Sequence, residues 1–108
     1  MRATAALCVL ALLTQPAWAA DDEPTTYVAF VQEPAARCVQ LGGMQVLVKS
    51  THPSRAIQIW LDRYQLGVGT GDRSRALLAP GGEPEPLGCT QNLTGAQEWR
   101  LARARFAE

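Results

Sequence analysis

Short segments in which apolar and polar residues alternate follow one another along most of this chain. The clearest is 44–50, where Met44, Val46 and Val48 lie on one side of an extended chain and the intervening residues lie on the other. A period of two predicts β-strands with one buried face. A short run at 87–89 would return the chain to the core. The pattern predicts further strands in four segments: 27–32, 37–41, 73–79 and 98–106.

Segment 56–66 fits two interpretations. Ile57, Leu61 and Tyr64 have the i, i+4, i+7 spacing of one helix face. Ile57, Ile59 and Leu61 also occupy alternate positions, and β-branched and aromatic side chains of this kind favour strands. Because a helix here would have a wide and irregular apolar face, we favour a strand and keep the helix as the alternative.

Glycine and proline separate these segments. Gly42 and Gly43 predict a tight turn, Pro53 interrupts the preceding strand, and the proline-rich run 80–86 predicts an exposed connection. Glycine at every second position of 67–72 permits backbone bends. Short strands with such closely spaced turns are typical of an all-β sandwich or barrel.

The run from Met44 to Cys89 has a distinctive order: a strand, a polar turn with proline, a second strand, and Leu78-Ala79-Pro80-Gly81 before a returning strand. In this order it resembles exported immunoglobulin-like sandwiches. We therefore expect an all-β fold, a small immunoglobulin-like antiparallel β-sandwich of about seven short strands with one disulfide. The resemblance is architectural and implies no activity, because such sandwiches serve many functions.

The first nineteen residues have the pattern of a secretory signal peptide. Arg2 precedes an apolar run at 5–13, and Ala17-Trp18-Ala19 is a small-x-small cleavage pattern. The run is too short to span a bilayer, so we expect no transmembrane anchor after cleavage and a location in the periplasm or outside the cell. The predicted organisation has three parts: a signal peptide at 1–19, a disordered mature N-terminus at 20–26 and a single β-sandwich domain at 27–108.

The chain has three cysteines, and Cys8 lies in the apolar part of the signal segment. Cys38 and Cys89 would remain in an oxidising compartment, where we expect them to form one structural disulfide. They are too far apart for a C-x-x-C redox motif. Two thiols and His52 also fall short of the four ligands of a closed zinc site, so we expect no metal and no cofactor.

Charge and catalytic residue types narrow the function classes. Ten Lys and Arg residues balance ten Asp and Glu residues, so no long-range field would attract nucleic acid, and we expect no nucleic-acid partner. His52 is the sole histidine, and it lies in a predicted turn where a solvated side chain is the simpler interpretation. Asp62 and Asp72 each stand next to an arginine, which favours ion pairs over paired-carboxylate catalysis. We therefore expect no enzymatic activity.

Aromatic and basic residues form the most informative set. Trp60 and Tyr64 share one side of the strand predicted at 56–66, while Trp99, Arg103 and Arg105 share one side of the last strand. If the two strands are neighbours, guanidinium groups would stack on the indole rings. The set is then a face that binds a protein or, alternatively, a sugar. The competing interpretation places both tryptophans in the core.

These observations favour a small exported, non-enzymatic binding or accessory protein of the bacterial cell envelope or of a secretion assembly. The alternative is a secreted proteinaceous inhibitor or immunity factor for an extracellular hydrolase, which would also explain the small size, the export and the disulfide. A compact hydrolase is the least favoured class, because a domain of this size has little room for a substrate cleft.

Overall fold

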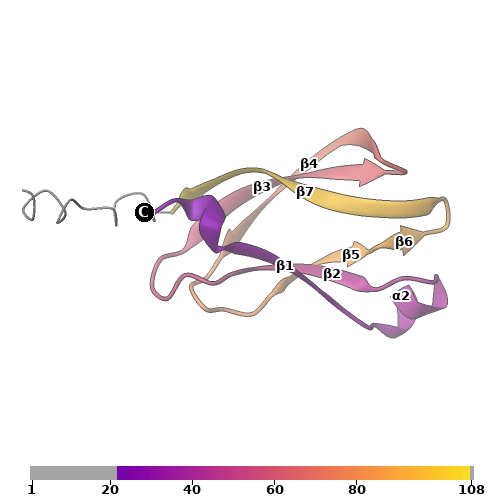
Figure 1. Cartoon of the computed structure of the whole chain (residues 1–108), viewed down its shortest axis with the longest axis horizontal. Coiled ribbons are helices and arrows are strands. Elements are labelled where there is room, and N and C mark those ends of the chain that lie inside the picture. The colour runs from indigo at the N-terminus through magenta and orange to yellow at the C-terminus, as the bar shows by residue number, and fades with distance from the viewer. Residues whose placement is uncertain (1–21, 108) are drawn as a thin grey trace, which may run out of the picture.

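The structure is a computed structural model that describes residues 22–107 (Figure 1). The signal peptide predicted at 1–19 lies outside the described residues. No helix in the described part of the chain is long and apolar enough to cross a membrane. The elements are, in chain order, η2 Pro24–Tyr27, β1 Val28–Glu33, α2 Ala36–Gln40, β2 Gln45–Ser50, β3 Ile57–Gln65, β4 Val68–Leu78, β5 Glu85–Cys89, β6 Gln91–Asn92 and β7 Gly95–Phe106.

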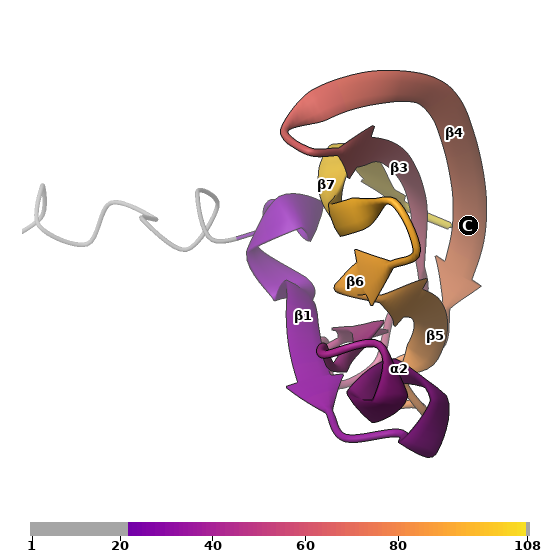
Figure 2. The same ribbon diagram turned by 90° about the vertical axis from the view of Figure 1, so that its right-hand side faces the viewer.

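The strands form two antiparallel sheets that face each other (Figures 1 and 2). The first has the order β1-β2-β5 and the second the order β4-β3-β7-β6. Strands β2 and β3 are consecutive but belong to different sheets; β5 then returns to β2 and β7 returns to β3. The prediction of an all-β antiparallel sandwich with seven strands and one disulfide is thus confirmed.

The core lies between the two sheets, and β3 contributes most of it. Ile57, Ile59 and Leu61 are almost completely buried, and they pack with Val48 of β2 and Leu78 of β4. Complete burial of each such side chain contributes roughly 1.5 to 3 kcal/mol. Segment 56–66 thus contains strand β3, in which alternate positions from Ile57 to Leu61 face the core, and the alternative of a helix is wrong.

The strand predicted at 37–41 is wrong: this segment is the short helix α2. Only Cys38 of the helix is buried, so the run has no alternating buried face. The glycine pair that follows ends the helix. The Gly42 N–H donates to the carbonyl of Val39, the Gly43 N–H donates to that of Cys38, and Gly42 has a φ of 86°. This paired bonding at a left-handed glycine is a Schellman cap, which a β-propensity reading of 37–41 does not take into account.

Two further segments differ from their expected structure. The glycine-rich run 67–72 and the strand predicted at 73–79 join into one strand, β4, with a register shift against β3 between Asp62 and Tyr64. In the segment expected to be disordered at 20–26, the described part includes the start of η2, which contacts β7.

Candidate binding face

The outer face of the four-stranded sheet carries the residues of interest. Because Ile59 and Leu61 point into the core, the residue between them, Trp60, points to the opposite face. The register places Trp60 between Arg75 of β4 and Arg103 of β7. Three neighbouring strands therefore present an arginine, a tryptophan and an arginine side by side.

Two guanidinium groups lie near the Trp60 ring. The Cζ atom of Arg103 is 4.8 Å from the ring centroid, and that of Arg105 is 5.8 Å from it. Each cation–π contact of this kind contributes roughly 0.5 to 1 kcal/mol at an exposed site. We call Trp60, Arg75, Arg103 and Arg105 the arginine–tryptophan face. The predicted stacking of β7 arginines on Trp60 is present in the structure.

Tyr64 lies further along the same strand and has a different arginine partner. The Cζ atom of Arg100 is 3.8 Å from the centroid of the Tyr64 ring. Arg100 also forms an ion pair with Glu98, with 2.6 Å between Nη2 and Oε2, and the hydrogen bond to Glu98 raises the pKa of Arg100. Tyr64 thus adjoins the arginine–tryptophan face, but Arg100, the cation that stacks on its ring, is already paired with the carboxylate of Glu98.

A second ion pair borders the face. Arg73 of β4 donates two hydrogen bonds, of 2.7 and 2.8 Å, to the carboxylate of Asp62 on β3. The hydrogen bond from Arg73 lowers the pKa of Asp62, and the same contact raises the pKa of Arg73. Asp72 is likewise paired with Arg63, at 2.9 Å. Both aspartates considered as catalytic candidates are therefore held by arginines.

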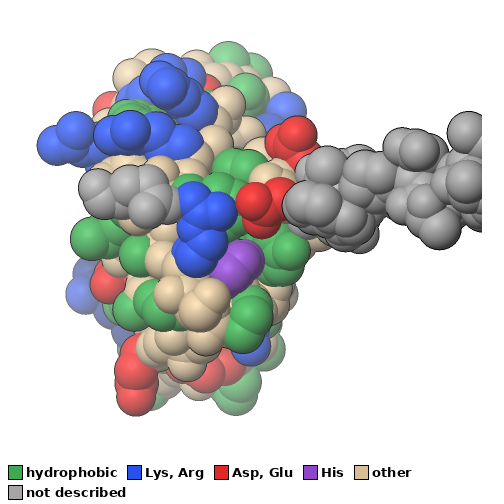
Figure 3. Space-filling model, turned by 90° about the vertical axis from the view of Figure 1, so that its left-hand side faces the viewer, with side chains coloured by type: hydrophobic (Ala, Val, Ile, Leu, Met, Phe, Trp, Pro, Cys, Tyr) green, Lys and Arg blue, Asp and Glu red, His purple; other side chains and the backbone are tan. Residues whose placement is uncertain are grey.

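The positive charge at the centre of the face is not balanced locally. Among the described residues, no carboxylate lies within ion-pair distance of Arg75, Arg103 or Arg105. Lysine and arginine side chains gather at the top of Figure 3, over this sheet. The outer face of β3, β4 and β7 carries five arginines (73, 75, 100, 103 and 105) against two carboxylates (62 and 98), because Arg63 lies opposite Trp99 on the other face together with its partner Asp72. The sheet has a positive outer face although the whole chain is neutral.

Trp99 does not belong to this face, contrary to the prediction from the sequence. It packs against the core, and its Cη2 atom lies 2.7 Å from the position that a Cβ would take at Gly88. The cause is a register shift in β7 that leaves Ala102 without a partner on β3. A bulge of one residue reverses which side chains point outward. Trp99 and Arg103, four positions apart, therefore lie on opposite faces of the sheet.

Arg75 belongs to the face and was missed by the sequence analysis. The alternation in 73–79 places Arg73 and Arg75 on one side of a strand. That alternation does not show which strand lies beside this one, and the position of Arg75 opposite Trp60 follows only from the pairing of β3 with β4. The hairpin of β3 and β4, closed at Leu66 and Gly67, would have been the usable signal.

His52 has a structural place in the turn between β2 and β3. The ring is buried, and its Nδ1 atom accepts hydrogen bonds from the backbone N–H groups of Ser54 and Arg55, at 3.1 and 2.9 Å. The ring also packs edge-on against Tyr27 and Phe106. His52 therefore stabilises the turn, and the solvated side chain expected from the sequence is wrong.

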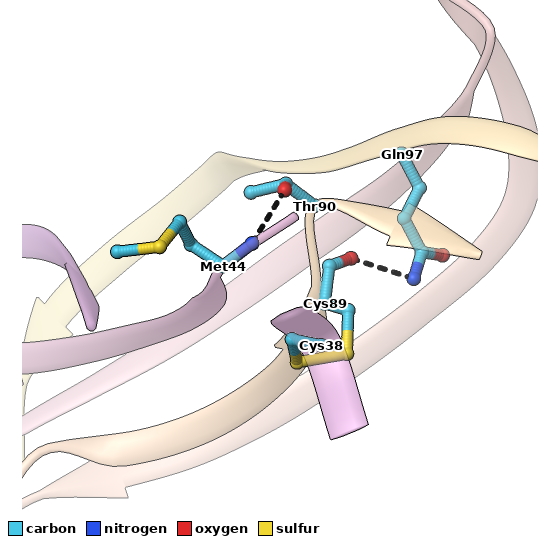
Figure 4. The surroundings of a disulfide bond; sticks show 5 residues. All are labelled: Cys38, Met44, Cys89, Thr90 and Gln97. Atoms are coloured by element: carbon cyan, nitrogen blue, oxygen red, sulfur yellow. Dashed lines mark hydrogen bonds between the residues drawn. A yellow bond between two sulfur atoms is a disulfide. The ribbon is translucent and has the colours of Figure 1, made fainter. Parts of the chain in front are cut away.

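The predicted disulfide joins Cys38 to Cys89, with the two Cα atoms 5.2 Å apart. It connects α2 to the end of β5. Figure 4 shows two hydrogen bonds that secure the surrounding chain: Thr90 Oγ1 accepts from the N–H of Met44 at 3.0 Å, and Gln97 Nε2 donates to the carbonyl of Cys89 at 2.8 Å. Together with the disulfide, these contacts hold α2, the start of β2 and the end of β5 against β7.

Two other kinds of site were considered within residues 22–107. No group of three or more His, Cys, Asp or Glu residues in this range is placed to hold a metal ion. An open pocket of about 370 Å³ adjoins the disulfide, and its lining includes Arg37, Gln45 and Gln97 but no carboxylate. Neither feature brings together an acid, a base and a nucleophile.

Comparison of the chain with known protein families, with curated proteins and with solved structures finds no match. The functional conclusion therefore depends on the geometry and charge of the described residues.

Proposed function

We propose that this protein is a small exported, non-enzymatic binding or accessory protein of the bacterial cell envelope or of a secretion assembly, and that it binds a protein partner through the arginine–tryptophan face. One observation carries the proposal: Trp60 lies on an outer sheet face between arginines that have no carboxylate partner among the described residues.

The composition of this face supports a binding role. Tryptophan and arginine are the residue types most enriched among those that dominate binding energy at protein interfaces. The β7 arginines at 4.8 and 5.8 Å hold the indole in place, so little side-chain entropy would be lost on association. Gathering like charges without counterions destabilises a fold slightly, and an acidic partner would remove that penalty.

The rest of the molecule is consistent with this proposal. The single histidine is occupied by backbone hydrogen bonds, and Asp62 and Asp72 are occupied by arginines. The disulfide suits an oxidising compartment outside the cytoplasm, in agreement with the signal pattern at 1–19. Export and binding together indicate an accessory component better than a catalyst.

The test uses site-specific photo-crosslinking in the producing cell. A photo-crosslinking amino acid replaces Leu77, which is 59% exposed on the outer face beside Gln58, or Val39, which is 54% exposed on α2. We expect one protein adduct from position 77, none from position 39, and loss of the adduct when Trp60→Ala is added. An adduct that forms equally well from both positions, or that survives Trp60→Ala, would contradict the proposal.

A second candidate function has its own supporting observation. Leu66, Val68 and Leu93 lie at the turns of the β3–β4 and β6–β7 hairpins and are 65%, 69% and 92% exposed. Leu66 also has a φ of 53°, which a two-residue type I′ hairpin turn requires, although Asn, Asp or Gly usually fills this position in place of a large apolar residue. A projecting apolar tip of this kind suits a secreted inhibitor or immunity factor that inserts into an enzyme. A hydrolase adduct from a crosslinker at Leu93, with none from position 77, would favour this candidate.

A further inference from the structure

Strand β4 forms a free edge of the four-stranded sheet, because the order is β4-β3-β7-β6. Figure 2 shows it running along the outer border of the molecule. It has eleven residues, nine of them exposed, and is the longest of the four edge strands in the described chain. An edge strand presents a row of backbone N–H and C=O groups that have no partner on one side.

Six consecutive residues of β4 are suited to pairing with another strand. From Arg73 to Leu78 the register with β3 is regular, and the sequence has neither proline nor glycine. Natural edges are usually protected by proline, by a bulge, or by charges that point inward. The inward-facing residues here are Ser74, Ala76 and Leu78, and the register irregularity of β4 ends before Arg73. The protection of 73–78 is therefore the outward charge of Arg73 and Arg75, which disfavours a positively charged strand but not an acidic one. By contrast, the edge strand β5 contains Pro86.

We propose that β4 accepts an extended segment of the protein partner as a fifth strand of this sheet, and that the segment has an acidic residue opposite Arg75, because Arg73 is already paired with Asp62 while Arg75 has no carboxylate partner among the described residues. The inference rests on the proposed function and specifies how the partner is bound. Arg75 has Trp60 as its neighbour on β3 and an empty position on the other side. A carboxylate in that position would have its Cβ about 5 Å from that of Arg75.

The charge pattern of β4 favours an acidic partner over a second copy of this chain. If β4 strands from two copies pair antiparallel with their outer faces on the same side of the sheet, each odd-numbered residue lies opposite an odd-numbered residue of the other copy. Centring the pair on residue 74 places Arg73 opposite Arg75 twice, and centring it on 73 or 75 places an arginine opposite itself. Registers centred nearer to Leu78 avoid this repulsion but leave Arg75 opposite an apolar or uncharged residue, with no attraction gained. Like charges directly opposite each other destabilise strand pairing. A strand with a carboxylate opposite Arg75 gains an attraction in the same geometry.

The test uses synthetic peptides as probes against the oxidised mature protein. The first alternates Thr and Glu over seven residues, the second has Gln in place of each Glu, and the third is the Glu peptide N-methylated at every second amide. We expect the Glu peptide to bind by fluorescence anisotropy at low salt, the Gln peptide to bind at least tenfold more weakly, and the N-methylated peptide not to bind. Backbone amides within 73–78 should exchange hydrogen more slowly in the complex.

Protein variants separate the edge from the face. Arg75→Gln should weaken binding of the Glu peptide about fivefold, whereas Arg37→Gln, an exposed arginine on α2, should leave it unchanged. Binding that tolerates N-methylation and depends on Arg103 would overturn strand addition and leave the proposed function standing. Protection of β1 in place of β4 would overturn the inference, as would absence of binding or a dimer that forms through β4. Loss of the Leu77 crosslink by Trp60→Ala would still support the function in those cases.

Discussion

The two tryptophans of the sandwich provide a matched test of the structure, since the same substitution should have different effects on opposite faces of one sheet. Trp60→Ala removes two cation–π contacts, to Arg103 and Arg105, worth roughly 0.5 kcal/mol each at an exposed site. The half-buried ring also covers some apolar surface. We therefore expect the free energy of unfolding to fall by about 1 to 2 kcal/mol.

Trp99→Ala should be more costly. The Trp99 ring is partly buried, as Trp60 is, but it packs against the core cluster and covers Gly88, so its removal takes apolar contacts away from the core. Large aromatic-to-alanine changes in such positions cost about 3 to 5 kcal/mol. Urea denaturation of the oxidised protein without residues 1–19, followed by circular dichroism, would measure both variants, with equal m-values showing that the midpoints report stability. Equal losses for the two variants, or a larger loss for Trp60→Ala, would refute the assignment of faces.

Three further predictions concern the scaffold. Replacing Cys38 by Ser should lower the free energy of unfolding by about 4 kcal/mol, since the bridge closes a loop with a sequence separation of 51; unfolding of the oxidised wild type and the variant would show it. Gly88→Ala should destabilise by about 1 to 3 kcal/mol because its Cβ would meet the Trp99 ring, and the change should be rescued in part by Trp99→Leu. Arg73 lowers the folded-state pKa of Asp62, so the ion pair adds to the free energy of unfolding above the unfolded-state pKa, and this stability is lost as the pH falls through the folded-state pKa. Asp62→Asn should therefore remove this loss of stability in acid. An unchanged dependence of stability on pH, measured by urea titrations below pH 5, would contradict the role of the pair.

The sequence predicted the sandwich well where a strand keeps one face buried throughout. In β3, Ile57, Ile59 and Leu61 alternate without interruption, and the strand forms as expected. The disulfide was also predictable, since two cysteines remain when the predicted signal segment is set aside. Segment 37–41 was not, because a run of five residues with one buried side chain has no period to detect, and the capping glycines after it decide the structure.

The candidate site was predicted in part for a related reason. Trp60, Arg103 and Arg105 come together because β3 and β7 are neighbours and their register is regular from Ile57 to Trp60. Trp99 was assigned to the wrong face because a period-two pattern carries no sign of the bulge at Ala102. Arg75 was missed because its position opposite Trp60 depends on which strands pair, which is a long-range property of the fold.

Arg75 connects the two proposals made for this protein. Its side chain belongs to the arginine–tryptophan face, while its backbone belongs to the free edge of β4. A partner strand added at this edge would extend the sheet and bring its own outward-facing side chains next to Arg75, with Trp60 one strand further in. Association through the edge and through the face would then occur in one rigid geometry, with main-chain hydrogen bonds contributing affinity and the arginines selecting acidic side chains. A sequence change at Arg75 therefore affects specificity more than fold, because the residue is exposed and has no carboxylate partner among the described residues.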